Sequence, residues 1–528
     1  MKDRDHVDQP AASDRISRRR FIASSAALGA GAALATSLPS SSGLAETPKQ
    51  GGTLRQGLGG ASTSDSFDPA TWSNDVALNL GFQTMNALVE IDSKLQATPE
   101  LAESWEAKPG AAEWIFNIRK GVHFHNGKEL DADDVIYSLH RHMGPNSKSG
   151  AKGQLSGIKE IKKSSPHQIT VLLDSGNADL PYNLSDFHLT IVPQGFEDWA
   201  HPIGTGGYVV ERFEPGVRAI TKRNPNYWKP GRAHFDSVET IVINDVTART
   251  NALLSNEIDV MNSVDRKTVD LMKRSSTVEI KRSSGGQHYA LPMDCESAIL
   301  RDNNVRLALK YGIDRQQMLK TILRGYGHLG NDHPIPVANP FHNQELTQRA
   351  YDPDKAKYHL KKAGSSDLNI DLYASEAAFP EAIDTAALYQ ATGKRAGINI
   401  NIKRAPADGY WDNVWMKVPF SMCFWLGRPT ADGTFSVQYK SDAAWNDSRW
   451  RRPAFDKLLL DARAELDFGK RKAMYWEMQR MVHEDGGEVI PVFADFIDAV
   501  NKKVQGFEPS PVLGLSGQRL AERAWFAS

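Results

Sequence analysis

The stretch WIFNIRKGVHFHNGKELDADDVIYSLHRHM, residues 114–143, changes its hydrophobic period once, and this change predicts a strand followed by a helix. Apolar residues alternate with more polar ones from Trp114 to Ile118, as expected for a strand with one buried face. The Asn-Gly pair at 126–127 tolerates positive φ and predicts a turn. Asp131 is placed to cap a helix, because the apolar residues after it recur at helical spacing.

The same stretch carries two histidines, His123 and His125, on the polar face of the alternation. Two imidazoles on one side of a strand suit a metal ion, but a solvated polar face explains the same spacing. No third ligand is suggested nearby, so we predict scaffold here and no metal site. The other conceivable metal or haem donors are His201, His288 and His333.

The length of the chain, 528 residues, is too great for one ordinary core and predicts two or three domains. No internal repeat or long linker occurs, so we expect the domains to be interleaved. With 63 Lys and Arg against 64 Asp and Glu, the chain lacks the basic footprint of a nucleic-acid binder. After the N-terminal region, no window approaches the roughly 18 apolar residues of a membrane span, so we expect no spanning segment.

The N-terminal residues predict an export signal. SRRRFI, at 17–22, is similar to a twin-arginine motif, and an uncharged apolar run and small residues up to Ala45 follow it. We therefore expect residues 1–45 to direct the chain to the periplasm by the twin-arginine route. The only cysteines, Cys295 and Cys423, lie far from this signal, so no lipid-bearing cysteine follows it. We expect two buried thiols, although the sequence leaves a disulfide open.

RKGVHFHNGKELDADDVIYSL, residues 119–139, resembles the signature segment of the peptide/nickel/opine family of solute-binding proteins of ABC importers. LAESW at 101–105, RNPNYW at 223–228 and YDPDKA at 351–356 resemble further segments of that family. The turn at 202–208 is similar to the family's G-T-G-P-Y, with glycine where proline is usual. The resemblance extends from about residue 51 to residue 507.

This resemblance implies an α/β fold of the type II periplasmic-binding-protein kind, with two α/β lobes, a hinge and an additional α+β domain. It also implies capture of a peptide or peptide-like solute between the lobes and delivery to an inner-membrane ABC permease, by a monomer without a cofactor. The implied segments are 46–88, 205–283 and 495–528 for lobe I, 89–204 for the additional domain, and 284–494 for lobe II.

Tryptophans are concentrated in one part of the expected lobe II. Five of the chain's 12 tryptophans fall between Trp411 and Trp450. Aromatic side chains bury much area with little loss of rotamer freedom, which suits a ligand pocket, although an aromatic core would have the same composition. The predicted ligand-contacting residues are Phe67, Trp72, His288, Trp411, Trp415, Trp425, Arg428, Thr430, Asp432 and Trp445.

One position departs from the family's pattern. Peptide-binding members carry an aspartate for the peptide's amino group in the segment F-x-x-x-x-W-x-x-D, and Arg428 occupies that place here. An arginine repels an ammonium group and prefers a carboxylate or phosphate. Asp432 either pairs with Arg428 or takes over amine binding. An opine, a sugar phosphate or another anionic solute is therefore an alternative ligand, as is a metal or haem.

An enzymatic function is the least favoured hypothesis for this chain. The sequence contains no G-x-S-x-G, H-E-x-x-H or C-x-x-C motif, and no cofactor fingerprint accompanies the export signal. Adjacent acids such as Asp133 and Asp134 point apart on a helix and are no catalytic pair. We predict a binding protein that returns its solute unchanged.

Overall fold

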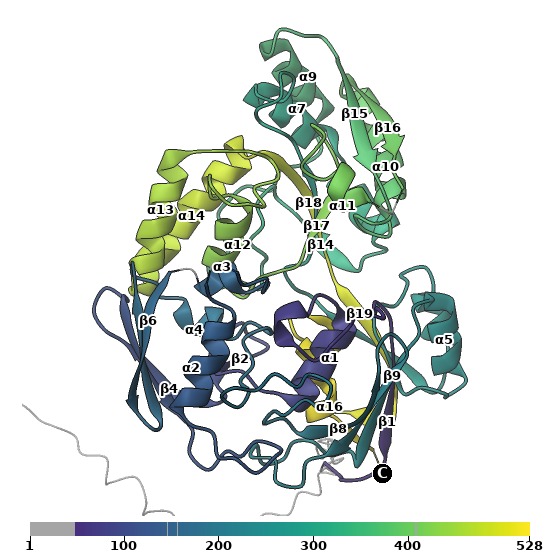
Figure 1. Ribbon diagram of the computed structural model, residues 1–528. Coiled ribbons are helices and arrows are strands. Elements are labelled where there is room, and N and C mark those ends of the chain that lie inside the picture. Colours follow the sequence, from purple (N-terminus) through teal and green to yellow (C-terminus); the bar gives the residue numbers. More distant parts are fainter. Residues whose placement is uncertain (1–47, 145, 156, 407–408, 528) are drawn as a thin grey trace, which may run out of the picture. The chain divides into compact units, whose positions relative to one another are not determined.

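The computed structural model describes residues 48–144, 146–155, 157–406 and 409–527 (Figure 1), so the predicted export signal lies outside the described residues. Residues 48–528 form one compact unit. Three separate sheets of four or more strands lie within it, and each has its own buried apolar cluster. We call the parts of the chain that carry these sheets lobe I, the additional domain and lobe II.

Lobe I is built on a seven-stranded sheet in the order β12-β19-β11-β1-β10-β9-β8. The central strand β1 runs parallel to both of its neighbours, and the remaining pairs are antiparallel. The strands come from three distant stretches of sequence. They are β1 (Thr53–Leu58), β8 (Tyr208–Glu214), β9 (Arg218–Arg223), β10 (Ser237–Val242), β11 (Val260–Met261), β12 (Val278–Ser283) and β19 (Phe496–Asn501).

The helices of lobe I cover this sheet and are short. The longest, α1 (Asp75–Thr84), begins after Asn74, whose side chain accepts hydrogen bonds from two backbone N–H groups of the first turn. The other elements are η1 (Pro69–Thr71), α5 (Val246–Leu254), α6 (Val269–Met272), α15 (Gly514–Gly517), α16 (Leu520–Arg523) and the two-stranded β20 (Val504–Gln505) and β21 (Trp525–Phe526).

The additional domain contains the stretch that changes period, and the structure confirms the predicted strand and helix. β5 (Glu113–Ile118) buries alternate residues, and α2 (Ala132–Arg141) starts with a capping box between Asp131 and Asp134. Its four-stranded sheet has the order β4-β5-β7-β6, with α2 against β6 (Figure 1). The other elements are β2 (Val89–Ile91), β3 (Ala97–Pro99), β4 (Ala102–Ala107), β6 (Ile158–Ser165), β7 (Gln168–Leu173), α3 (Lys152–Leu155) and α4 (Leu180–Asn183).

The two histidines of the stretch have different surroundings. His123 is exposed, whereas His125 places its Nε2 3.0 Å from the carbonyl oxygen of Gly206. Burial lowers the pKa of His125. A Cβ on Gly206 would come 2.3 Å from the backbone carbonyl carbon of Thr84, so this turn admits only glycine. His125 therefore holds the glycine-rich turn against the end of α1.

Lobe II is built on a four-stranded sheet in the order β14-β18-β13-β17, and a parallel pair, β15 and β16, lies under α10. Figure 1 shows α12, α13 and α14 grouped on another side of that sheet, and α13 packs against both of the others. The strands are β13 (His288–Pro292), β14 (Gly327–Leu329), β15 (Leu368–Ala374), β16 (Ile398–Arg404), β17 (Cys423–Trp425) and β18 (Glu488–Ala494). The helices are α7 (Asn303–Gly312), α8 (Arg315–Gln317), η2 (Met318–Ile322), α9 (Pro353–Lys362), α10 (Ala382–Arg395), α11 (Tyr410–Asn413), α12 (Ala431–Gln438), α13 (Pro453–Ala464) and α14 (Phe468–Asp485).

Two crossings join lobe I to lobe II. One runs from β12 to β13 through residues 284–287, and the other passes from β18 to β19 at Asp495. Beside the second crossing, the guanidinium of Arg266 in lobe I donates to the Asp495 carbonyl at 2.9 Å and to Glu381 in lobe II at 3.0 Å. An ion pair therefore spans the lobes next to the crossing strands.

Six charged side chains, four buried and two half-buried, lie together where the additional domain meets lobe I. Lys229 Nζ lies 2.7–3.1 Å from three glutamates, and Arg519 forms two hydrogen bonds to Glu100. Burial opposes the ionisation of Glu90, but the neighbouring cations hold its pKa well below the ordinary value. We call this group the six-charge network, and its members are Glu90, Glu100, Lys229, Arg519, Glu522 and Arg523.

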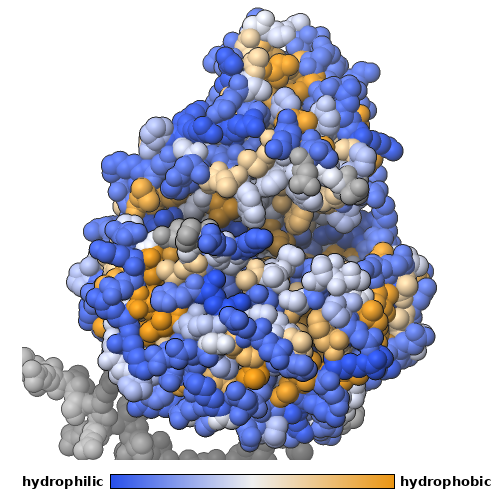
Figure 2. All heavy atoms as spheres, viewed as in Figure 1, coloured by the Kyte–Doolittle hydropathy of each residue, from blue (hydrophilic) through white to orange (hydrophobic). Residues whose placement is uncertain are grey.

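Apolar side chains are scattered in small groups on the mostly hydrophilic face of Figure 2. No helix among the described residues is long and apolar enough to span a bilayer.

Both cysteines are free: Cys423 is buried as expected, but Cys295 is only half-buried, because it lies in a loop rather than in a sheet. Burial still raises the pKa of the Cys295 thiol to about 11.

Candidate ligand-binding site

Four of the predicted tryptophans form one connected group of rings. Trp415 lies at its centre, with ring centroids 5.7 Å from Trp411, 6.2 Å from Trp425 and 6.2 Å from Trp445. Trp411 and Trp445 remain 38% and 48% exposed, although large apolar side chains are usually buried. The group is therefore open to solvent on one side and offers aromatic surface to a solute. We call it the tryptophan cluster.

The strand β17 fixes this cluster in lobe II. Trp425 on β17 is paired in register with His288 on β13. The fifth tryptophan, Trp450, is 1% exposed and packs against Phe455 in the core beneath α12 and α13. The local concentration of tryptophan thus combines an exposed cluster with one ordinary core residue.

Two buried carboxyl groups lie directly beneath the tryptophan cluster. Asp447 accepts a hydrogen bond from the indole of Trp415 at 3.0 Å, and Glu488 accepts one from the hydroxyl of Tyr439 at 2.7 Å. The second oxygen of each carboxyl is buried without a hydrogen-bond partner among the described side chains. Burial raises the pKa of both groups, and the Asp447 charge raises that of Glu488 further. We infer that the two carboxyl groups share one proton, which satisfies both of these oxygens.

Arg428 follows β17 by three residues and has no ion pair or side-chain hydrogen bond within the described part of the chain. Its charged neighbour is Asp186 of the additional domain, which lies beyond the distance of an ion pair. Burial lowers the pKa of the Arg428 guanidinium, and Asp186 opposes this effect. A half-buried, permanently charged cation without a direct partner favours an anionic ligand.

Asp186 is itself held by fixed donors. His188 places its Nδ1 2.6 Å from one carboxyl oxygen, and the amide of Gln154 donates to the other at 2.5 Å. The Nε2 of His188 lies 3.0 Å from the carbonyl oxygen of Trp72 in lobe I. Burial alone would raise the pKa of Asp186, but the contact with His188 and the charge of Arg428 lower it. A polar chain thus runs from Trp72 through the additional domain toward Arg428.

Asp432 does not pair with Arg428. Its carboxylate accepts two hydrogen bonds from Arg463 on α13, at 3.0 and 3.2 Å, and is 4% exposed. Thr430 caps α12, because its hydroxyl accepts from the N–H of Gly433 at 3.0 Å. Both of these predicted residues are therefore engaged in holding α12, and Asp432 is already neutralised.

The remaining predicted residues lie in protein cores. Phe67 packs edge-on against Phe213 at 4.8 Å, and the Trp72 ring lies so close to Gly81 that any Cβ there would clash with it. His288 is 1% exposed, with Nδ1 2.9 Å from the carbonyl oxygen of Gly286, and burial lowers its pKa to about 4. Trp425 of the tryptophan cluster and Arg428 are three residues apart on lobe II, whereas Phe67 lies in the core of lobe I.

Backbone contact fixes the start of the Arg428 segment. A Cβ on Gly427 would come 2.4 Å from the Cα of Gly286, and a Cβ on Gly286 would come 2.6 Å from the Cα of Gly427. No side chain larger than hydrogen fits at either position. Because Gly286 belongs to the crossing from lobe I, Arg428 begins one residue from that crossing.

Sequence patterns did not identify Asp186, His188, Asp447 or Glu488. Asp186 and His188 pair with each other within one loop, but their further partners Gln154 and Trp72 are 32 and 116 residues away, and the partners of Asp447 and Glu488 are 32 and 49 residues away. The one local signal was the pair of tryptophans at 411 and 415, because an indole N–H that becomes buried needs an acceptor. Among the described residues, no group of three or more His, Cys, Asp or Glu is arranged to hold a metal ion.

Comparisons with known proteins agree with this architecture. The model of the bacterial extracellular solute-binding proteins, family 5 (middle part), matches residues 96–447. A dipeptide-binding protein of Escherichia coli K12 is 26% identical over 495 residues, which cover 85% of this chain and 91% of the relative. The family prediction made from the sequence is confirmed, and members of this family are extracytoplasmic binding proteins.

Solved structures show the same fold. The periplasmic binding protein DppA of Helicobacter pylori, in complex with the peptide STSA, has a TM-score of 0.78 at 23% identity and covers 91% of this chain and 99% of its own. AgaA of A. tumefaciens R10, in complex with agropinic acid, has a TM-score of 0.77 at 23% identity, with 90% and 99% covered. The predicted type II periplasmic-binding-protein fold is confirmed.

Proposed function

We propose, because this chain belongs to family 5 of the bacterial extracellular solute-binding proteins, that it captures a peptide or peptide-like solute between lobes I and II and delivers it to the permease of an ABC importer. In this proposal, residues 1–45 export it to the periplasm by the twin-arginine route, without a lipid anchor. It acts as a monomer and returns its solute unchanged. Ligand stabilises a closed arrangement by contacting both lobes.

One observation supports an anionic ligand: Arg428, three residues after Trp425 of the tryptophan cluster, has no ion pair among the described residues, while Asp432 is paired with Arg463. The segment that carries an amine-binding aspartate in peptide-binding relatives thus presents a cation. A carboxylate of the solute would complete the hydrogen bonds of this guanidinium in bidentate geometry. The indole rings would cover the apolar part of the same solute.

This observation favours a solute with an acidic group, either an acidic or carboxylate-oriented peptide or a non-peptide anion such as an opine or a sugar phosphate. The named relatives fit both classes, since one is a dipeptide-binding protein and one solved neighbour holds agropinic acid. Nickel and haem receive no support from the described residues, because no cluster of donors is present among them. They remain in the test as competing outcomes.

The test is a thermal-shift screen of the purified protein after its ligand has been removed by mild unfolding. The panel contains di- to pentapeptides, opines, phosphorylated sugars, nickel and haem. A ligand at a hundred times its dissociation constant adds about 2.7 kcal/mol to stability, and we expect a midpoint shift of roughly 3 °C with acidic solutes.

Two variants sharpen this screen. Arg428→Gln should weaken binding of the acidic solute about 10- to 100-fold, because a charge-assisted hydrogen bond is lost. Arg480→Gln, which alters an exposed arginine on α14, is the matched control and should bind normally. Equal binding by wild type and Arg428→Gln would show that Arg428 does not bind the solute. A shift of the unfolding midpoint with nickel or haem alone would show that the ligand is a metal or haem and not an acidic solute.

A further inference from the structure

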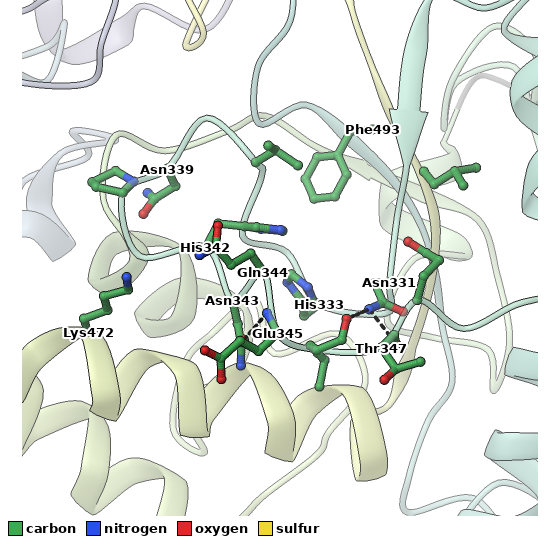
Figure 3. Close-up of a pocket in the computed structure, with 15 residues that line it drawn as sticks. Asn331, His333, Asn339, His342, Asn343, Gln344, Glu345, Thr347, Lys472 and Phe493 are labelled. Atoms are coloured by element: carbon green, nitrogen blue, oxygen red, sulfur yellow. Dashed lines mark hydrogen bonds between the residues drawn. The ribbon is translucent and has the colours of Figure 1, made fainter.

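Lobe II contains a cavity whose lining includes neither the tryptophan cluster nor Arg428, although Asn339 in that lining donates to the carbonyl oxygen of Pro429 at 3.4 Å. It has a volume of about 550 Å³ and lies between the loop 329–348, the helix α14 and the strand β18 (Figure 3). Its lining includes none of the ten residues predicted from the sequence, as far as the described residues go. This volume is within the range of sites that hold small molecules.

Most of the amides in this wall are occupied in shaping the loop. Asn331 donates to the carbonyl oxygens of Leu346 and Thr347, and the side chain of Asn343 accepts from the N–H of Glu345 at 3.0 Å (Figure 3). The side chain of Asn339 accepts from the N–H of Phe341 at 2.9 Å. These bonds hold the cavity open in a fixed form.

His333, in contrast to these amides, is a polar side chain of the lining without a hydrogen bond to the described residues. Its side chain is 1% exposed, and neither ring nitrogen has a hydrogen-bond partner among the described residues. In Figure 3 the ring lies in the middle of the lining, between Phe493 and the turn that carries Asn343 and Glu345. A buried imidazole that lacks both a donor and an acceptor partner costs stability unless something else occupies the site.

The neighbouring groups define what could occupy it. The ring of His342 lies 5.4 Å from that of His333, and its Nδ1 is 2.9 Å from the carbonyl oxygen of Ile335, which leaves Nε2 as an acceptor. Burial lowers the pKa of His333 to about 3, so its imidazole is neutral at physiological pH. Phe493 also lines the cavity, but its ring is 2% exposed and lies parallel to the ring of His328, with centroids 4.9 Å apart.

We propose that this cavity is a second binding site, which takes a planar, uncharged polar group with an adjacent donor and acceptor, such as a carboxamide on a ring. The N–H₂ group of the ligand's carboxamide donates to an acceptor nitrogen of the two histidines. The oxygen of the same carboxamide accepts from the N–H of His333. The site is independent of the anion proposed for Arg428, because the two sets of residues do not overlap.

The probe is nicotinamide, with nicotinate as its charged counterpart of the same shape. Saturation-transfer NMR on the purified protein should show saturable binding of nicotinamide and at least fivefold weaker binding of nicotinate. His333→Leu, which fills the same space without polar atoms, should abolish the nicotinamide signal. Arg428→Gln should retain it, and this separates failure at this cavity from failure of the anion site.

A stability measurement accompanies the binding test. Because an unpartnered polar ring is removed, His333→Leu should raise the midpoint of thermal unfolding of the free protein, whereas His359→Leu, at a ring that contacts Asn304, should not. A crystal of the wild-type protein soaked in nicotinamide should show the carboxamide beside His333 and His342. No binding, equal binding by His333→Leu, preference for nicotinate, or density elsewhere would each overturn the proposal.

Discussion

The six-charge network and the Arg428 site both hold charges that are at least half-buried, but only the network is balanced. In the network, three cations face three glutamates at hydrogen-bond distance, and each charge has at least one direct partner. At Arg428, the cation has Asp186 at longer range, and Asp186 is already held by His188 and Gln154. Protein structure alone completes the network, whereas the Arg428 site lacks an anion.

This difference separates charges that hold the fold from charges that recognise a solute. A partnered buried ion contributes stability through its partner, and removing either member leaves an uncompensated charge. An unpartnered buried ion lowers the stability of the free protein. Binding of a ligand with the opposite charge restores that stability. The contrast can be tested by removing one arginine from each region.

The largest effect is expected in the network. Arg519→Met removes the two hydrogen bonds to Glu100 and leaves that carboxylate buried, so the free energy of unfolding should fall by about 3–5 kcal/mol. Chemical denaturation measures this loss, and Arg480→Met on the exposed face of α14 is the control. A loss no larger than that of the control would show that the network is not the stabilising group we describe.

A second, smaller effect compares two arginines of lobe II. Arg463→Gln leaves Asp432 buried without its ion pair and should lower the free energy of unfolding by about 2 kcal/mol. Arg428→Gln breaks no direct pair in the free protein, so its stability should be unchanged or raised. If denaturation instead shows equal losses for both variants, Arg428 has a structural partner and the comparison fails.

The smallest effect concerns the carboxyl pair beneath the tryptophan cluster. Because burial raises the pKa of Asp447 and Glu488 above the unfolded values, the pair stabilises the fold while it holds its shared proton, and this stability is lost as the pH rises through the raised pKa. Asp447→Asn keeps an acceptor for Trp415 and offers Glu488 a donor that does not titrate. The decline in unfolding free energy between about pH 5 and pH 8 should therefore shrink by about 1 kcal/mol.

Chemical denaturation at a series of pH values measures that decline, and tryptophan emission reports the same titration from the cluster. The matched control is Asp371→Asn, at a carboxyl group on β15 that pairs with Lys403 near the surface. A decline that is as steep in Asp447→Asn as in the wild type would show that the two carboxyl groups do not share a proton.

The sequence predicted the features that depend on local period and chain order. The strand before residue 118 and the cap at Asp131 follow from spacing alone, and the motifs identified the family. The concentration of tryptophans indicated a cluster, although composition could not separate exposed Trp445 from buried Trp450. Exposure depends on which neighbours a segment meets, and local pattern does not contain this information.

The polar partners of the site could not be predicted for the same reason. Asp186 meets Arg428 across more than 200 positions of sequence, and Glu488 meets Asp447 only because β18 returns beneath the cluster. Asp432 illustrates the converse, since its nearest arginine in sequence is Arg428 but its partner is Arg463 on α13. Side-chain pairing follows the packing of helices and strands and not proximity along the chain.

The contact between Gly286 and Gly427 has a mechanical consequence. The backbones of the two glycines touch directly, so the spacing of the two loop segments is set by van der Waals radii alone. If lobe II turns about the crossing segments during the proposed closure, this contact is the pivot, and Arg428 sits one residue from it. A group so near the axis moves little while the far walls of the site swing. The charged end of a solute would therefore be bound in the open protein, before the lobes enclose the rest of the solute.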